Sequence, residues 1–177
     1  EYADYAGYDP EEFKELVNQD LKKLYQAREK RVRPHRDEKV LTDWNALMIS
    51  ALAKAARVFD DEEMKSMAGT AACFLLGNLK TKEGTLLHRY GDGQAAIEGH
   101  ADDYAYLIWA MLESFETTQD PTYLKEATEL QATFEKHFWD PKGGFYFTSD
   151  QGESLLIRNK EGFDGALPSA NSVALHN

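Results

Sequence analysis

The chain has 177 residues, of which 42% are hydrophobic and 29% charged, a length and balance that suit one globular domain with a hydrophobic core. Its formal net charge of −11 argues against phosphate neutralisation, so we expect no nucleic-acid partner. Neither a membrane-spanning apolar run nor the pattern of a secretory leader is visible. We therefore expect no membrane partner and a cytoplasmic protein.

Cys73 is the only cysteine of the sequence. An internal disulfide and a multi-cysteine zinc site are therefore excluded. The stretch at 69–74 has the small and apolar residues of a packed helix. We accordingly expect Cys73 to be a buried, inert thiol.

Two kinds of helix alternate in the first part of the chain. Asp9 and Pro10 begin a helix whose apolar residues form one stripe, which is typical of a helix lying on a surface. Thr42 is predicted to cap a second helix that is apolar almost all round and should be buried on most sides. The acidic pair at 60–61 begins a third helix, which is again one-sided.

The same alternation continues after a short extended segment. Residues 84–90 have strand character and are followed by a turn at 91–93. A fourth helix begins near His100 and is apolar nearly all round, whereas the fifth, which begins at Asp120, is one-sided. This order predicts a second hairpin of one inner and one outer helix.

The last part of the chain adds turns, extended segments and the start of another helix. Residues 145–148 are predicted to form a short strand, and residues 155–158 are available to pair with it. A sixth helix is expected to begin near Pro168.

These helices form an internal repeat of roughly 50–65 residues. The stretch at 79–87 resembles the stretch at 139–147, each supplying a turn and a short strand after a one-sided helix. We therefore predict an all-α fold over 1–177: an α/α-hairpin repeat that forms a partial (α/α)₆ toroid, with short β-hairpins in its loops. A closed ring needs about twice the three or so hairpins found. The chain is thus expected to be a fragment, completed by the remainder of the toroid or by a second copy.

Four ordered segments carry a family resemblance. They read RPHRDEKVLTDWNALMI at 33–49, EGHADDYA at 98–105, GGFY at 143–146 and DGALPSANSVA at 164–174. Together they resemble the spermatogenesis-associated protein 20 family. The segments are spread over most of the chain, which makes the resemblance far more specific than one short motif.

The resemblance implies a two-part protein. Members of the family carry a thioredoxin-like domain followed by an (α/α)₆ toroid similar to six-hairpin glycosidases and N-acylglucosamine 2-epimerases. This chain resembles the middle of that toroid only. Glu38 stands where the family often has Asp, and Ala46 and Ala170 stand where it often has Gly. None of these departures removes an ionisable group.

Polar residues gather at the predicted starts of the inner helices, where a ring of hairpins would line a central funnel. Sugar hydrolysis needs two carboxyl groups that flank the scissile bond, and aromatic faces suit the apolar faces of sugars. The candidate catalytic residues are Asp43, Glu98, His100, Asp102 and Asp103. The candidate substrate-binding residues are Trp44, Asn45, Tyr104, Asp164, Ser169 and Asn171.

Each candidate also has a structural interpretation. Asp and Asn at helix starts commonly act as caps, and Trp44 is of a type that usually packs in a core. Epimerisation next to a carbonyl would use acid/base groups on opposite faces of the substrate, and His88 and His100 are available for it. His100 with Asp102 or Asp103 has no third ligand at a recognisable spacing, so we expect no metal and no cofactor.

The sequence therefore predicts a segment of a glycosidase-like or epimerase-like toroid that binds or processes a carbohydrate ligand in a central funnel. If the segment belongs to an enzyme, we expect glycoside hydrolase-like or sugar epimerase-like chemistry. The alternative is a non-catalytic helical scaffold or interaction domain.

Overall fold

A computed structural model describes residue 5, residues 7–153 and residues 155–177. The chain divides into two compact units, Glu1–Asp37 and Glu38–Asn177, and each is described by itself. The predicted toroid domain over all 177 residues stays a prediction. Among the described helices, none combines the length and the apolar character that crossing a membrane requires.

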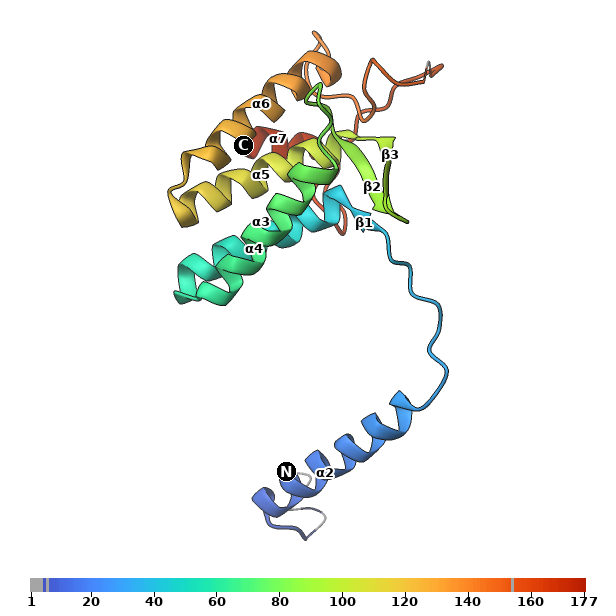
Figure 1. The fold of residues 1–177 in the computed structure, drawn as a ribbon, viewed down its shortest axis with the longest axis vertical. Coiled ribbons are helices and arrows are strands. Elements are labelled where there is room, and N and C mark those ends of the chain that lie inside the picture. Colours follow the sequence, from blue (N-terminus) through green and yellow to red (C-terminus); the bar gives the residue numbers. More distant parts are fainter. Residues whose placement is uncertain (1–4, 6, 154) are drawn as a thin grey trace. The chain divides into compact units, whose positions relative to one another are not determined.

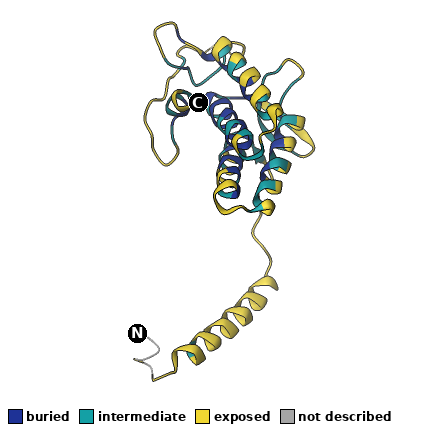
Figure 2. Ribbon diagram, turned by 90° about the vertical axis from the view of Figure 1, so that its left-hand side faces the viewer, coloured by how far each residue is buried: buried dark blue, intermediate teal, exposed yellow. Residues whose placement is uncertain are grey.

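The first unit contains helix α2 (Pro10–Glu29) (Figure 1). Asp9 caps it as predicted, because its carboxylate accepts hydrogen bonds from the backbone N–H groups of Glu11 and Glu12. None of the residues of α2 is buried, and Figure 2 shows this exposure along the helix. Phe13 of its apolar stripe is partly buried and lies against Tyr8, with the ring centroids 5.8 Å apart, whereas Leu21, Leu24 and Tyr25 are exposed.

The second unit is built from two layers of helices (Figure 1). They are α3 (Thr42–Phe59), α4 (Glu62–Asn78), α5 (Ala101–Thr118), α6 (Pro121–Phe138) and α7 (Ala170–His176). Helices α3, α5 and α7 are the inner helices, and α5 packs against both of the others. The outer helices α4 and α6 pack on α3 and α5 respectively. The α/α-hairpin fold predicted from the sequence is confirmed.

The core of this unit centres on α5, which is buried along most of its length (Figure 2). Leu107 and Met111 of α5 are fully enclosed, together with Phe134 and Phe138 of α6. Helix α3 differs from the prediction that it is buried on most sides. Among the described helices, α4 and α5 pack on it, and β1 and β2 contact it as well. Its Ile49 is buried, whereas other apolar side chains on the same helix remain exposed.

A small antiparallel sheet lies at the N-terminal ends of the inner helices (Figure 1). It consists of β1 (Val40–Leu41), β2 (Leu87–Gly91) and β3 (Gln94–Glu98), in the order β1-β2-β3. Asp92 and Gly93 join β2 to β3 with φ values of 51° and 76°, as in the tight turns that favour hairpins. The predicted strand at 84–90 thus corresponds to β2. Strands β1 and β3 were not predicted.

The strand predicted at 145–148 is wrong. Phe145 forms only a single bridge with Trp139, and the Phe147 N–H donates to the Asn159 carbonyl over 2.7 Å. The Arg158 side chain bonds the Thr148 carbonyl instead of extending a backbone ladder. Single backbone bonds and the Arg158 side chain thus hold this loop in the described part of the chain.

Two residue-level predictions are also wrong. Thr42 does not cap α3, because it is the first helical residue and its hydroxyl donates to the Leu87 carbonyl over 2.6 Å. This bond fastens α3 to β2. Cys73 is exposed, since it lies off the face through which Ala72 and Leu75 of α4 enter the core.

The internal repeat is regular, with a period of 59 residues: α5 begins and ends 59 residues after α3. Asp60 and Gln119 end these helices in the left-handed region, with φ values of 54° and 59°. Asp61 and Asp120 then cap the two outer helices, as predicted.

The turns after the outer helices follow the same period. The Leu87 N–H donates to the Leu79 carbonyl, and the Tyr146 N–H donates to the Phe138 carbonyl, both over 2.8 Å. Leu79 therefore corresponds to Phe138. The sequence comparison of 79–87 with 139–147 predicts Trp139 instead, which is one residue too far along the chain. The buried apolar residue at the end of each outer helix sets this register, since Trp139 itself is exposed.

Candidate functional site

The N-terminal ends of α3 and α5 are joined by one buried carboxylate. Asp103 is the third residue of α5 and is 0% exposed. Its two oxygens accept hydrogen bonds from the backbone N–H of Asp43 over 3.0 Å and of His100 over 2.7 Å. Asp103 thereby caps the start of α5 and also satisfies an unpaired donor of the neighbouring helix α3.

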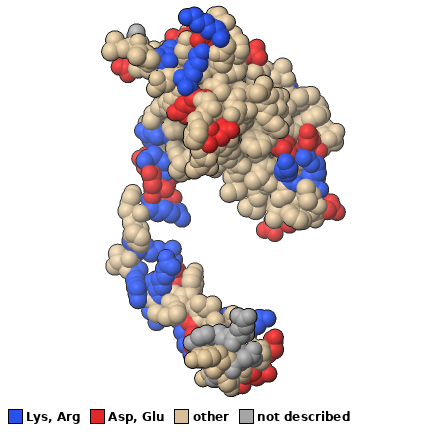
Figure 3. All heavy atoms as spheres, turned by 180° about the vertical axis from the view of Figure 1, so that it is seen from behind, with Lys and Arg blue, Asp and Glu red and all other residues tan. Residues whose placement is uncertain are grey.

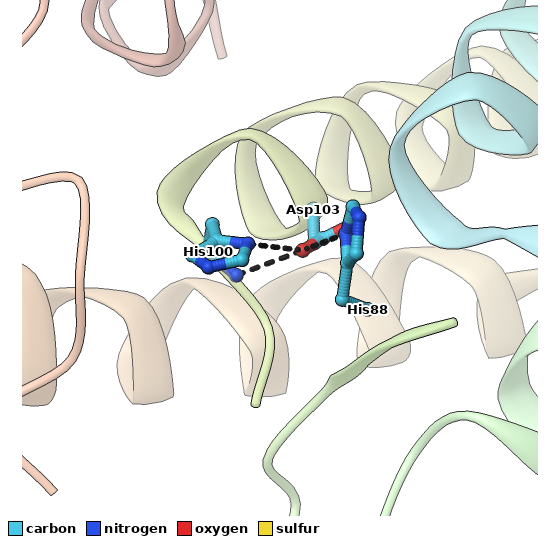
Figure 4. Close-up of side chains that lie close together, drawn as sticks. All are labelled: His88, His100 and Asp103. Carbon is cyan, nitrogen blue, oxygen red and sulfur yellow. Dashed lines mark hydrogen bonds and ion pairs between the residues drawn. The ribbon is translucent and has the colours of Figure 1, made fainter. Parts of the chain in front are cut away.

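Two imidazoles lie beside this carboxylate (Figure 4). His88 of β2 has its Nδ1 atom 3.1 Å from both oxygens of Asp103. His100 has its Nδ1 atom 3.8 Å from Oδ2 of Asp103, and its ring stacks on Phe147 with the centroids 4.8 Å apart. The cluster therefore joins a strand, a helix start and the loop that follows α6.

Asp102 plays the corresponding part on the other flank of α5. Its carboxylate faces the backbone N–H of Ala170, the first residue of α7. Successive residues of a helix point about 100° apart. Asp102 and Asp103 consequently face different neighbours, and the bond from the Asp43 N–H to Asp103 fastens the start of α5 to α3.

Burial and like charges act on the two half-buried carboxyl groups at this end. Burial, followed by the negative charges of Glu161, Asp103 and Asp43, raises the pKa of Asp102 to about 6. Burial and the charge of Asp103 also raise the pKa of Asp43. Both groups are thus less ready to ionise than exposed carboxyl groups.

The two imidazoles are shifted in opposite directions. The hydrogen bond to Asp103 raises the pKa of His88, whereas burial lowers the pKa of His100. Their ring centroids lie 5.1 Å apart and the rings are steeply inclined. For a sugar ring to fit between them, the two imidazole rings would have to lie roughly 7 Å apart, because each van der Waals contact spans about 3.5 Å. The pair is therefore not placed on opposite faces of one substrate, as the epimerisation alternative would require.

Tyr104 is buried, and its part in binding a substrate stays a prediction. It is 2% exposed and stacks on Phe134 with the centroids 5.6 Å apart. Its hydroxyl accepts a hydrogen bond from the Leu86 N–H over 2.8 Å, and burial raises its pKa to about 12. Tyr104 is a core residue that supports the turn before β2.

The two candidate asparagines brace the backbone. The Asn171 amide accepts from the Phe145 N–H over 2.7 Å and donates to the Phe145 carbonyl over 3.0 Å, as a neighbouring strand would. The Asn45 amide donates to the Leu41 carbonyl over 2.7 Å. Because these bonds occupy them, both residues have a structural role in this structure.

Ser169 and Asp164 order the start of α7. The Ser169 hydroxyl accepts from the Ser172 N–H over 3.2 Å and caps the helix. The Asp164 carboxylate accepts a hydrogen bond from the Ser169 N–H over 2.9 Å. This bond is the main cause that lowers the pKa of Asp164. Their first task is therefore to fix the loop against α7.

Two of the remaining candidates keep accessible side chains. Trp44 lies in the first turn of α3 and is 61% exposed. Glu98 ends β3 and, with His100, Thr148 and Ser149, lines a cavity of about 360 Å³. The structure therefore leaves an aromatic face beside Asp43 and a cavity of mixed lining beside His100.

His88 is named from the sequence only as an available acid/base group, and its place beside Asp103 is not predicted there. Its spacing from His100 carries no known motif, but the Asp92-Gly93 turn offers a signal. A two-residue hairpin loop fixes the register so that β2 runs beside β3, whose end leads directly into the start of α5. Together, this strand register and the cap at the start of α5 predict that His88 lies close to Asp103.

The cluster also offers metal ligands. One ligand atom each from His88, His100 and Asp103 lie within 4.8 Å of one another. The expectation of no metal rested on the lack of a third ligand, and His88 supplies one. On the face seen in Figure 3, both acidic and basic side chains lie among the uncharged residues of the second unit.

Comparison with known proteins identifies relatives over nearly the whole chain. It is 37% identical over 182 residues to human spermatogenesis-associated protein 20, covering 97% of this chain and 23% of that protein, and equally to the mouse protein. This likeness supports the spermatogenesis-associated protein 20 family. A Caenorhabditis elegans protein is 35% identical over 94% of this chain and 24% of its own length. No family model matches. The chain thus spans about a quarter of the relatives that it matches.

Solved structures share the fold at low sequence identity. Cellobiose 2-epimerase from Bacillus thermoamylovorans has a TM-score of 0.65 and 18% identity over 81% of this chain and 39% of its own. A family 105 glycoside hydrolase of C. acetobutylicum has a TM-score of 0.62 and 16% identity over 78% and 41%. An α-mannanase of Bacteroides thetaiotaomicron has a TM-score of 0.59 and 18% identity over 66% and 34%. At these identities the likeness shows an α/α-toroid fold.

Proposed function

We propose that the starts of α3 and α5 form part of the wall of a carbohydrate-binding funnel, with Asp43 and Asp102 as its pair of carboxyl groups. The observation that carries the proposal is their equivalence. Each is the second residue of an inner helix, 59 residues apart, and each is half-buried at the same end of the fold. After burial and the charges of Glu161 and Asp103, the negative charge of Asp43 also raises the pKa of Asp102, which supports placing the two carboxyl groups in one site.

Such a pair suits the cleavage of a glycosidic bond. One carboxyl group protonates the leaving oxygen, while the other attacks the sugar or activates a water. Asp43 and Asp102 come from neighbouring helices, so a substrate lying across the helix starts would meet both. Trp44 adds an exposed indole next to Asp43, and its apolar face suits the C–H face of a sugar ring.

The fold supports this proposal. Proteins described as a cellobiose 2-epimerase, a glycoside hydrolase and an α-mannanase share the α/α-toroid architecture. Fold alone does not assign a reaction, because the reaction depends on the specific residues of the site. The chain spans 23% of its human relative, so the proposal concerns the wall that this segment contributes.

Sugar binding and turnover by the purified protein test the proposal. Cellobiose, mannobiose and their monosaccharides are the probes, with calorimetry for binding and sugar analysis for turnover. We expect Asp43→Asn and Asp102→Asn to lose turnover of a bound disaccharide while retaining binding. We expect Trp44→Ala to weaken binding. The wild-type protein should bind at least one of the disaccharides.

Asp61→Asn and Asp120→Asn are the matched controls. These two residues are likewise 59 apart, but they cap the outer helices, and Asn is also a good cap. They should leave binding and turnover unchanged. If none of the probes binds, or if all four Asn variants behave alike, the carboxyl pair has no role in a sugar site.

A non-catalytic scaffold is the second candidate function. It is favoured by the hydrogen bonds through which Asp103 caps α5 and fastens it to α3. In that case Asp103 variants would lower the stability of the fold, while the protein would show no response to any of the sugars.

A further inference from the structure

We propose that His88, His100 and Asp103 form a binding site for a divalent transition metal such as zinc. Two imidazoles and one carboxylate are ligands that such metals accept, and here they come from β2, the residue that caps α5 and the first turn of α5. The inference goes beyond the carbohydrate proposal and does not depend on it, because the carboxyl groups assigned there are Asp43 and Asp102.

The distances between the ligand atoms suit a single small ion. Zinc binds nitrogen and oxygen at about 2.0–2.2 Å with tetrahedral geometry, so two of its ligands lie roughly 3.4 Å apart. The His88 and Asp103 atoms are 3.1 Å apart, and the His100 and Asp103 atoms are 3.8 Å apart. All three ligand atoms lie within 4.8 Å of one another. A small rotation of the imidazoles therefore brings them to coordination distance.

The residues around Asp103 fix its carboxylate in a position from which it can bind a metal ion. The backbone N–H groups of Asp43 and His100 each bond one oxygen, which fixes the carboxylate. An ionised carboxylate has about four lone-pair positions, so it can also bind an ion on the side that faces the imidazoles. Phe147 stacks on His100 and limits its ring. Such supporting contacts tune metal sites as much as the ligands do.

The site is enclosed on the side of Asp103 and open on the side of the imidazoles. The side chain of Asp103 is 0% exposed, whereas those of His88 and His100 are 23% and 30% exposed. An ion held by these three ligands would therefore keep a position for water or another small ligand. Three protein ligands and one open position are typical of zinc sites that carry out chemistry.

The internal repeat indicates that this cluster is an addition to the hairpin scaffold. At the 59-residue period, His88 corresponds to Phe147 and Asp103 corresponds to Trp44. The scaffold thus builds the equivalent turn without an imidazole and the equivalent helix start without this carboxylate. The arrangement of His88, His100 and Asp103 is therefore not required to make an α/α hairpin.

Zinc binding to the purified full chain tests the inference. The protein is freed of metal with a chelator and then titrated with zinc chloride against a chromophoric zinc indicator, with no sugar present. We expect one zinc ion per chain. Loss of a supporting contact typically weakens metal binding 10–100-fold, so loss of a ligand in His88→Phe or His100→Ala should weaken it by more than about 100-fold.

His137→Ala is the matched control, because His137 also pairs with a carboxylate, that of Asp150 over 2.7 Å, at a site without a second imidazole. It should retain the zinc affinity of the wild type. Circular dichroism shows whether each variant folds, and His88→Gln replaces His88→Phe if the latter does not. If the wild type binds no zinc stoichiometrically, or if His88 and His100 variants bind as the wild type does, His88 and Asp103 form only an ion pair. That outcome overturns the metal site and leaves the carboxyl pair Asp43 and Asp102 untouched.

Discussion

Helices α3 and α5 occupy equivalent places in the repeat, yet their surroundings differ. Both are 18 residues long and apolar nearly all round, and both end in a left-handed residue before a capped outer helix. Within the second unit, α5 lies between two other inner helices, whereas α3 has an inner neighbour on one side only. An apolar surface on all sides therefore shows that a helix is able to be buried. How far it is buried depends on the helices that pack around it.

The polar ends of the two helices differ as well. Asp43 and Asp102 are the same residue at the same position, but the next residue is Trp44 in α3 and Asp103 in α5. The exposed indole leaves the start of α3 accessible, whereas the buried carboxylate gathers His88 and two backbone donors around the start of α5. The two helix starts therefore share one backbone arrangement, and the side chain at the equivalent position, Trp44 or Asp103, makes them differ.

The largest expected difference concerns Leu107 and its counterpart Met48. Leu107 of α5 is 0% exposed, whereas Met48 of α3 is 58% exposed. Leu107→Ala should lower the free energy of unfolding by about 2–5 kcal/mol, because it leaves a cavity. Met48→Ala should change it by less than about 0.5 kcal/mol. Urea unfolding followed by circular dichroism measures both, and similar losses would show that α3 is as enclosed as α5.

The next effect concerns the carboxylate that joins the two helices. Asp103→Ala leaves the N–H groups of Asp43 and His100 without their acceptor. Each orphaned donor costs on the order of 1–3 kcal/mol, and the lower end applies because both lie in a partly buried region. The same unfolding measurement tests this. Amide hydrogen exchange should also increase at the starts of both α3 and α5, and an increase confined to α5 would contradict the link between them.

A smaller effect, which depends on pH, concerns the loop after α6. Lys160, the Lys142 N–H and the Tyr146 hydroxyl hold the pKa of Asp140 well below its ordinary value of 3.8. A lowered carboxyl pKa stabilises the fold above that ordinary value, and the stabilisation is lost as the pH falls through the native pKa. Asp140→Asn should therefore melt below the wild type from pH 5 to 7, and the difference should shrink below about pH 4. Melting curves at a series of pH values test this, and a pH-independent difference would exclude the charge as its cause.

The smallest expected change in stability follows from Trp44→Ala. The side chain is 61% exposed, so the free energy of unfolding should change by less than about 0.5 kcal/mol. A large loss of unfolding free energy would mean that Trp44 packs against a part of the protein outside the second unit. Helix α3 would then be more enclosed than the second unit alone shows.

Local signals in the sequence correctly indicated most of the helices. Asp9, Asp61 and Asp120 cap helices as expected, because a cap depends only on residues within one turn. The alternation of one-sided and all-round helices likewise identified the hairpins. The strand at β3 was missed because its residues, QAAIE, have little β propensity, and the hairpin turn and pairing with β2 hold it in place.

The sequence by itself determined the hairpin repeat and the polar character of the inner-helix starts, since both follow from periodicity and caps within short stretches. Only the tertiary structure decided which of those polar residues meet. It placed Tyr104 in the core, used Asn171 to bind the Phe145 backbone, and brought His88 from a strand to Asp103 at a helix start. The reason is that side-chain contacts between elements depend on register and packing, and a single sequence encodes these only through the whole fold.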